Sequence, residues 1–359
     1  MPHTGIVLAL ALCAVCIVGI NACSAARNGG ACGPFGDPPA SIIGSAKLDC
    51  GEGATLGPWQ DPDGTDRYAC LYQPASAGTK EKLPLLVYLH PSLFSAGATI
   101  KKTNLLALKD SALLGGNLKR PGFIVLAPQG RRTRHYYPFP DNRGMGWDNW
   151  YRQLSPAGDV KIGGHVYPEN VDAVTIDRFL AQVTASGSVD TRRIYVTGWS
   201  NGAAMGLLYA LNRPDVAGVT VYSALDPFGA LNDACPQQPV DGDPVSITQV
   251  RIVNPRVPAM HVHNSCDVVG ICPNGEKLAL QLRSAGVTVR DVITDSSGRQ
   301  VDACEASCGT NPEGDTNPLR NLKGWWVGLR HHSKWPGTWT PAMLEFLRAN
   351  PLQPARVPF

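Results

Sequence analysis

A serine between two glycines is the residue of this chain best placed for chemistry. Residues 193–205 read Arg-Ile-Tyr-Val-Thr-Gly-Trp-Ser-Asn-Gly-Ala-Ala-Met, a pattern that predicts a strand followed directly by a helix. So tight a turn favours Gly198 and Gly202, because side chains there would collide with neighbouring elements. The motif predicts that Ser200 is a nucleophile and that the amide of Asn201, in the first turn of the helix, binds an oxyanion.

A serine hydroxyl is a weak nucleophile and needs a histidine base that a carboxylate orients. On this type of turn the chain order is Ser, then acid, then His. We expect the acid to be Asp267, which ends a long apolar strand, with Asp226 as the alternative. We expect the base to be His332, on a loop between the last strand and the last helix, with His331 as the alternative.

The elements that must position these residues alternate along the chain. Strands are predicted at residues 67–73, 83–90, 122–128, 193–199, 218–225, 259–267, 287–294 and 325–331. Helices are predicted at residues 103–114, 169–186, 201–213, 275–285 and 341–349. Because several strands are apolar on both faces, they suit a parallel sheet that is covered on both sides. The fold class is therefore α/β, with one doubly wound, mainly parallel sheet.

The amino terminus has the features of an export signal. Residues 6–20 are free of charged side chains, but the run is shorter than the roughly 20 residues that span a bilayer. Residues 20–23, Ile-Asn-Ala-Cys, resemble a bacterial lipobox, which predicts lipidation of Cys23. Simple secretion and a retained anchor are the alternatives. We expect a signal peptide at 1–22, a leader or linker at 23–60 and a catalytic domain at 61–359.

The chain has 11 cysteines, and export explains most of them. Two lie in the signal and Cys23 is the lipid acceptor, so 11 − 3 = 8 remain, an even number that suits disulfides in an oxidising compartment. These eight are Cys32, Cys50, Cys70, Cys235, Cys266, Cys272, Cys304 and Cys308. We expect a Cys50–Cys70 bridge and cross-links among the last four.

No metal centre is expected from the cysteine spacing, since Cys266-x5-Cys272 and Cys304-x3-Cys308 do not follow the C-x2-C pattern of zinc sites. His261 and His263 alternate onto one face of a strand and are expected to be ordinary strand residues.

Composition excludes other classes of protein. The net charge is +3, from 32 basic and 29 acidic residues, which argues against a nucleic-acid partner. The charged fraction of 17% is too low for a disordered chain. Membrane contact is expected only through the lipid anchor.

With these residues in place, the chain resembles the α/β-hydrolase esterases of the extracellular polyhydroxybutyrate depolymerase and feruloyl/acetylxylan esterase group. The resemblance runs from about Tyr68 to Pro351. It is carried by residues 144–151 (Gly-Met-Gly-Trp-Asp-Asn-Trp-Tyr), 189–196, 198–205, and His332 ahead of Trp335-Pro336-Gly337. A more distant likeness is to oxidised polyvinyl alcohol hydrolases. The resemblance implies an α/β-hydrolase fold and catalysis without a cofactor.

The segment after the second predicted strand departs from this group, which usually has His-Gly there. This chain has His90-Pro91-Ser92, and proline has no N–H to donate. We therefore expect Ser92 to supply the second oxyanion donor, beside Asn201.

Four aromatic residues are candidates for the substrate cleft, where they would stack on substrate or anchor a packed loop. They are Trp147, Trp150, Tyr151 and Trp199.

The expected function is that of an exported serine carboxylesterase or depolymerase, which acts on small or polymeric esters through an acyl-enzyme. As a lipoprotein it would lie at a bacterial outer membrane, in the periplasm or on the cell surface; otherwise it would be secreted. The alternatives are a β-diketone hydrolase acting on oxidised polyvinyl alcohol with the same triad, and a non-catalytic surface-binding lipoprotein.

Overall fold

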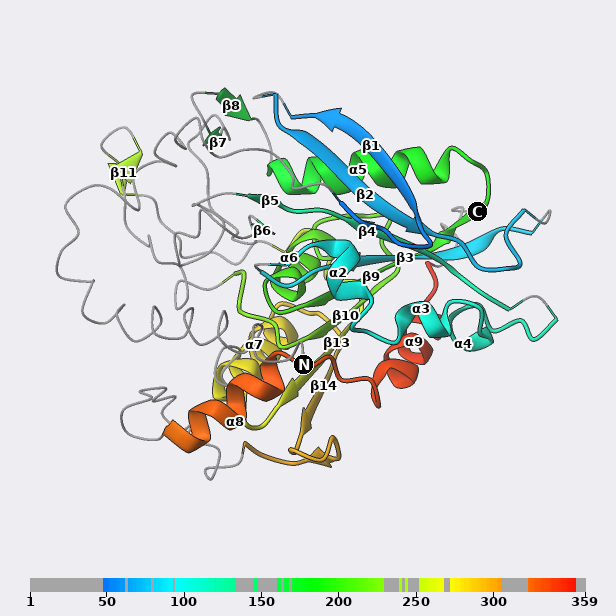
Figure 1. Cartoon of the computed structure of the whole chain (residues 1–359). Coiled ribbons are helices and arrows are strands. Elements are labelled where there is room, and N and C mark those ends of the chain that lie inside the picture. The colour runs from blue at the N-terminus through cyan, green and yellow to red at the C-terminus, as the bar shows by residue number, and fades with distance from the viewer. Residues whose placement is uncertain are drawn as a thin grey trace, which may run out of the picture.

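The structure is a computed structural model of the whole chain (Figure 1). The structure describes residues 48–61, 64–78, 81–92, 94–119, 121–132, 145–147, 160–162, 165–167, 170–228, 239–240, 243–244, 252–267, 272–304 and 322–352. Among these residues, no helix combines the length and the apolar character that crossing a membrane requires.

Within the described residues, the main sheet has nine strands in the order β1-β2-β4-β3-β9-β10-β13-β14-β15. Its strands are β1 (Ala54–Gln60), β2 (Asp66–Tyr72), β3 (Leu83–Leu89), β4 (Ile124–Pro128), β9 (Val189–Trp199), β10 (Gly218–Tyr222), β13 (Ala259–Asn264), β14 (Val289–Thr294) and β15 (Gln300–Val301). All pairs from β4 to β14 are parallel. The outer pairs β1–β2, β2–β4 and β14–β15 are antiparallel.

Small antiparallel pairs complete the described strands. They are β5 (Arg131–Arg132) with β6 (Met145–Gly146), β7 (Val160–Ile162) with β8 (His165–Tyr167), and β11 (Pro239–Val240) with β12 (Asp243–Pro244).

Helices cover both faces of the sheet. They are α2 (Ala96–Ile100), α3 (Leu105–Leu108), α4 (Ala112–Gly115), α5 (Val171–Thr184), α6 (Asn201–Ala210), α7 (Cys272–Ser284), α8 (Leu322–His332) and α9 (Thr340–Arg348). Strand β3 shows how the faces separate, since Leu85 and Val87 pack in a core with α5, α6 and α7, whereas Leu86 and Tyr88 pack in a second core with α2, α3, α4 and α9. The predicted doubly wound, mainly parallel architecture is confirmed.

The predicted strand at 325–331 is wrong, because these residues lie in α8. The burial pattern explains the difference: residues 328, 329 and 332 are buried while Trp326 and Arg330 are exposed, which is the spacing of a helix with one buried face. The single helix predicted at 103–114 is instead two short helices, α3 and α4. The Ser111 side chain caps the second by accepting a hydrogen bond from the Leu113 amide.

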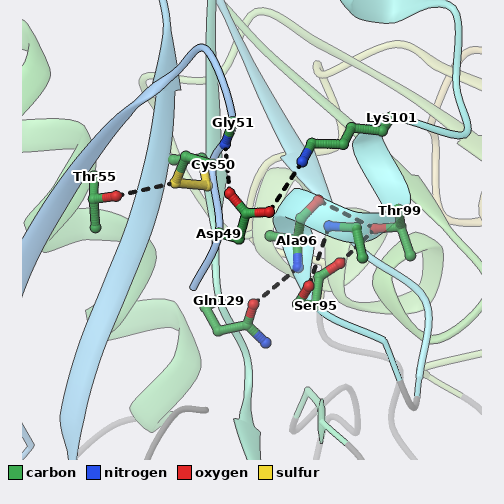
Figure 2. The surroundings of a disulfide bond; sticks show 11 residues. Asp49, Cys50, Gly51, Thr55, Ser95, Ala96, Thr99, Lys101 and Gln129 are labelled. Carbon is green, nitrogen blue, oxygen red and sulfur yellow. Dashed lines mark hydrogen bonds and ion pairs between the residues drawn. A yellow bond between two sulfur atoms is a disulfide. The ribbon is translucent and has the colours of Figure 1, made fainter. Parts of the chain in front are cut away.

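The sheet begins earlier than the predicted domain boundary. Strand β1 pairs with β2 along most of its length, so residues 54–60, assigned to the leader, belong to the sheet. The expected Cys50–Cys70 bridge is confirmed and ties the segment before β1 to β2. Figure 2 shows this disulfide beside the start of α2, where the Ala96 amide donates to Gln129 Oε1 at 2.8 Å.

A second disulfide joins Cys272, the first residue of α7, to Cys304, just after β15. Cys266 is also disulfide-bonded. The remaining predicted cysteines, Cys23, Cys32, Cys235 and Cys308, lie outside the described residues.

Candidate active site

Ser200 lies at the sharp turn between β9 and α6. Its backbone has φ 56° and ψ −120°, a conformation that L-residues adopt only when the surroundings impose it. Both flanking positions require glycine because a side chain would have no room there. A Cβ at Gly198 would lie 2.2 Å from the Gly202 carbonyl oxygen, and one at Gly202 would lie 2.2 Å from that of Leu89. The turn therefore presses α6 against both β9 and the end of β3.

Ser200, His332 and Asp267 form one hydrogen-bonded series. His332 Nε2 lies 2.8 Å from Ser200 Oγ, and His332 Nδ1 lies 3.0 Å from each carboxylate oxygen of Asp267. All three residues are buried, Asp267 completely and His332 with 8% of its surface exposed. Because a carboxylate only accepts, Nδ1 carries the proton and Nε2 is left to accept from the Ser200 hydroxyl.

Asp267 is held by the turn that follows β13 and by the end of β10. Its amide donates to the Asn264 carbonyl at 2.9 Å. The Ser223 hydroxyl donates to its Oδ2. Within the described part of the chain, Ser200 and Ser223 are the two non-glycine residues with positive φ. Both therefore use a strained backbone to point a hydroxyl into the same hydrogen-bonded series.

His332 is the last residue of α8, not a loop residue as predicted. Two aromatic side chains hold the end of this helix: the Trp199 indole donates to the His332 carbonyl at 2.9 Å, and the Tyr222 hydroxyl donates to the His331 carbonyl at 2.8 Å. Trp335 packs edge-on against both rings. The base is thus positioned by residues that end β9 and β10.

The alternative residues have other roles. Asp226 accepts from the Phe228 amide at 2.8 Å within its own turn. His331 contributes its backbone carbonyl to Tyr222.

The loop after β3 is fixed by His90. Its Nδ1 donates to the Pro91 carbonyl at 2.8 Å, and its Nε2 accepts from the Gly130 amide at 2.9 Å. Complete burial lowers the pKa of His90 to about 4, so the ring is neutral and can make both bonds at once. This arrangement holds the backbone that leads to Ser92.

Ser92 and Asn201 are the predicted oxyanion donors. The Ser92 hydroxyl oxygen is buried and has no hydrogen-bond partner, and Pro91 has no N–H. Asn201 is the first residue of α6, so its amide has no partner within the helix. The close contact of Gly202 with the carbonyls of residues 89 and 90 brings the two segments together.

Trp147 and Trp199 are packed anchors, and the prediction that they line the cleft is not supported by their burial. Trp147 is completely buried, with its amide donating to Asn201 Oδ1 at 2.8 Å and its indole to the His90 carbonyl at 2.9 Å. Trp199 is 5% exposed. The other two aromatic candidates, Trp150 and Tyr151, lie outside the described residues.

Sequence reasoning missed Tyr222 and Ser223. Their signal is their place at the carboxyl end of a buried parallel strand next to the nucleophile strand, where functional side chains of such sheets gather.

Ser223→Ala tests the role of the second strained serine. Loss of a hydrogen bond to a buried carboxylate is expected to lower kcat about tenfold, with KM unchanged because the residue does not reach the substrate. Ser223→Gly is the matched control, since it also lacks the hydroxyl but tolerates positive φ. If kcat falls in the alanine variant and not in the glycine variant, loss of the hydrogen bond is not the cause of the fall.

The Cys272–Cys304 bridge fixes the start of α7, the helix that follows Asp267 in the chain. Replacing both cysteines with serine is expected to lower activity severalfold and stability by about 2–4 kcal/mol. Mild reduction of the unmodified protein should lower activity while the far-ultraviolet circular dichroism is unchanged. The double serine variant at Cys50 and Cys70 is the control, and is expected to lose stability with little change in kcat. An equal loss of kcat in the Cys272/Cys304 and Cys50/Cys70 variants would contradict a local effect of the Cys272–Cys304 bridge on the site.

Comparisons with known proteins identify the fold. No family model matches the chain, and no curated protein matches it by sequence. Among solved structures, a ferulic acid esterase is 12% identical, covering 83% of this chain and 97% of its own, with a TM-score of 0.50. An esterase of Pyrobaculum calidifontis is 15% identical, covering 82% and 85% of the two chains, with a TM-score of 0.44.

A thermostable esterase is 18% identical over 77% of this chain, with a TM-score of 0.38. The match spans 61% of that esterase's length. With its parallel sheet, its helices on both faces and a strand–Ser200–helix turn at the centre, the chain has the α/β-hydrolase fold.

Proposed function

We propose that this chain is a serine carboxylesterase. The observation that carries the proposal is the series in which Ser200 Oγ lies 2.8 Å from His332 Nε2 and His332 Nδ1 lies 3.0 Å from Asp267. Ser200 and Asp267 come from the turns after β9 and β13, and His332 is the last residue of α8. A nucleophile, a base and an orienting acid in this order are the parts that acyl transfer requires.

In the first half of the reaction, Ser200 Oγ attacks the ester carbonyl carbon while its proton passes to His332 Nε2. The tetrahedral intermediate collapses, the alcohol leaves with the proton from Nε2, and the acyl group stays on Ser200. In the second half, water attacks the acyl-enzyme and gives its proton to Nε2. Return of that proton to Ser200 Oγ releases the acid.

Asp267 serves both halves by holding the imidazole in the tautomer that leaves Nε2 free. When His332 becomes protonated, the buried carboxylate 3.0 Å away stabilises the imidazolium. The Ser223 hydroxyl donates to Oδ2 of the same carboxylate.

Two donors are proposed to stabilise the oxyanion. The Asn201 amide lies at the positive end of α6, and Ser92 contributes its amide or its unpartnered hydroxyl. The neutral His90 supports this pocket by keeping the loop in place without adding a charge.

The substrate class is proposed to be a carboxylic ester, either soluble or polymeric, of the kind that depolymerases and feruloyl or acetylxylan esterases cleave. The ferulic acid esterase that shares the fold is consistent with this class. We further propose export, with Cys23 as the lipidated residue. The apolar run at 6–20 and the disulfides support export.

The test is a substrate panel combined with covalent labelling. The purified protein is assayed on short p-nitrophenyl esters, feruloyl and acetyl sugar esters, polyhydroxybutyrate oligomers and a β-diketone. A fluorophosphonate probe is then located by peptide mass spectrometry. Ester turnover with the label on Ser200 is expected. Faster turnover of the diketone than of an ester of similar size would reject esterase activity as the main function, and an unlabelled Ser200 would reject catalysis by this site.

A further inference from the structure

Two histidines and an aspartate meet on the face of the sheet that α7 covers. His261 and His263 are two residues apart on β13, so their side chains lie on the same face. Asp291 is the register partner of His261 on the parallel neighbour β14. We call this group the His–His–Asp cluster. It belongs to none of the hydrogen-bonded groups described around Ser200.

The distances in the cluster fit ligands that share an ion better than they fit hydrogen bonds. Asp291 Oδ1 lies 3.3 Å from His261 Nδ1 and 3.2 Å from His263 Nε2. Neither contact has hydrogen-bond geometry, and all four ring nitrogens are buried without a hydrogen-bond partner in the part of the chain that the structure describes. Two ligands at about 2.0–2.1 Å from a tetrahedral ion lie about 3.3 Å apart, whereas N–H···O bonds are typically about 2.9–3.0 Å.

Because the ring nitrogens of His261 and His263 are buried, leaving them without a partner lowers the stability of the fold. Both histidines are completely buried, and an unsatisfied buried polar atom costs about 1–3 kcal/mol. Such groups in native proteins normally have a ligand, a water or another partner. The two imidazoles also stack, with ring centroids 4.6 Å apart and planes within 8°, so they cannot both be protonated without strong repulsion.

The helix above the cluster leaves room for the rings. A Cβ at Gly275 of α7 would lie 2.8 Å from His263 Nδ1 and 3.1 Å from His261 Cε1. Glycine at this position therefore lets the backbone of α7 pass close over the two rings. The Cys272–Cys304 bridge fixes the start of this helix next to the cluster.

The donor types favour a cation. Neutral imidazoles and an ionised carboxylate are the forms in which these groups bind metals.

We propose that the His–His–Asp cluster binds one divalent transition-metal ion, with Zn²⁺ as the reference ion. The ligand atoms are His261 Nδ1, His263 Nε2 and Asp291 Oδ1, which all lie within 4.8 Å of one another. Two imidazoles select Zn²⁺, Cu²⁺ or Ni²⁺ over Ca²⁺ and Mg²⁺, which prefer oxygen ligands. The ion would join β13 to β14 directly beneath the turn that carries Asp267.

The experiment measures Zn²⁺ bound by the purified protein after chelation and dialysis against ZnCl₂. One Zn²⁺ per chain and a higher thermal midpoint with Zn²⁺, but not with Mg²⁺, are expected. Asp291→Asn is expected to weaken binding by more than about tenfold, since loss of even an outer partner of a metal ligand costs about 10–100-fold. Asp190→Asn is the matched control, because this aspartate lies outside the cluster, also contacts a basic side chain and is similarly exposed, at 17% against 12%.

Each outcome bears on the proposal. Retention of full Zn²⁺ binding by Asp291→Asn, or no binding by the unmodified protein, would overturn it. If Asp291→Asn does not fold, the double variant H331Q/H332Q decides, since it removes the adjacent histidines near Ser200 and leaves the cluster intact. Unchanged binding of one ion, with two nitrogen couplings in the spectrum of bound Cu²⁺, supports the cluster. Loss of binding in the double variant overturns it.

Discussion

Ser200→Ala is expected to lower kcat for ester hydrolysis by about a million-fold, the scale seen when a triad nucleophile is removed. Alanine keeps the Cβ, so the packing of the turn is unchanged, but no atom remains to form the acyl-enzyme. The backbone at φ 56° is as strained for alanine as for serine, so the free energy of unfolding should change little. Steady-state kinetics on p-nitrophenyl butyrate and a thermal melt measure the two effects.

The matched control for this experiment is Ser223→Ala, the same substitution at the other non-glycine residue with positive φ. It shares the backbone strain and the contact with the triad but not the nucleophile. We expect a loss of about tenfold there. Similar kcat values for the two variants, or fluorophosphonate labelling of the Ser200→Ala variant at another serine with full activity, would show that Ser200 is not the nucleophile.

Asp267→Asn is expected to lower kcat by about 10⁴-fold, as loss of the orienting carboxylate does in other triads. An amide in this position can donate to His332 Nδ1, which then accepts and moves the ring proton to Nε2. In that tautomer Nε2 cannot take the proton of Ser200 Oγ. Substrate binding should persist, so KM is expected to change much less than kcat.

Asp226→Asn is the control for the acid, because this residue is the other aspartate that the chain order allows. Its carboxylate accepts from the Phe228 amide and lies in a separate turn, so we expect a change of less than about threefold, within the range of substitutions away from the chemistry. A larger loss in Asp226→Asn than in Asp267→Asn would assign the acid to the other turn.

The nucleophile could be predicted because its geometry is local. Five consecutive residues determine the turn at Ser200, and the spacing of its glycines follows from contacts within that turn and with the neighbouring strand. The acid and base needed the chain order as a guide, since 65 and 132 residues separate His332 from its two partners. Asp267 was preferred over Asp226, and His332 over His331, because of the strands and motifs next to them.

The elements around the base were harder to predict. The run Trp325-Trp326-Val327 is apolar enough to fit either a strand or a helix, and short apolar runs do not separate the two by periodicity. The contacts of Ser223 with Asp267 and of Tyr222 with the His331 carbonyl depend on the register of β10 against its neighbours. Likewise, alternation placed His261 and His263 on one face, but Asp291 joins them only through the register of β13 with β14.

The indole of Trp199 links the residue immediately before the nucleophile to the carbonyl of the base. Trp199 ends β9, so this bond limits how far the end of α8 can shift against the sheet. Misplacement by about 1 Å can cost about 100-fold in rate. One indole on the strand of the nucleophile therefore opposes changes in the distance between the reacting atoms of Ser200 and His332.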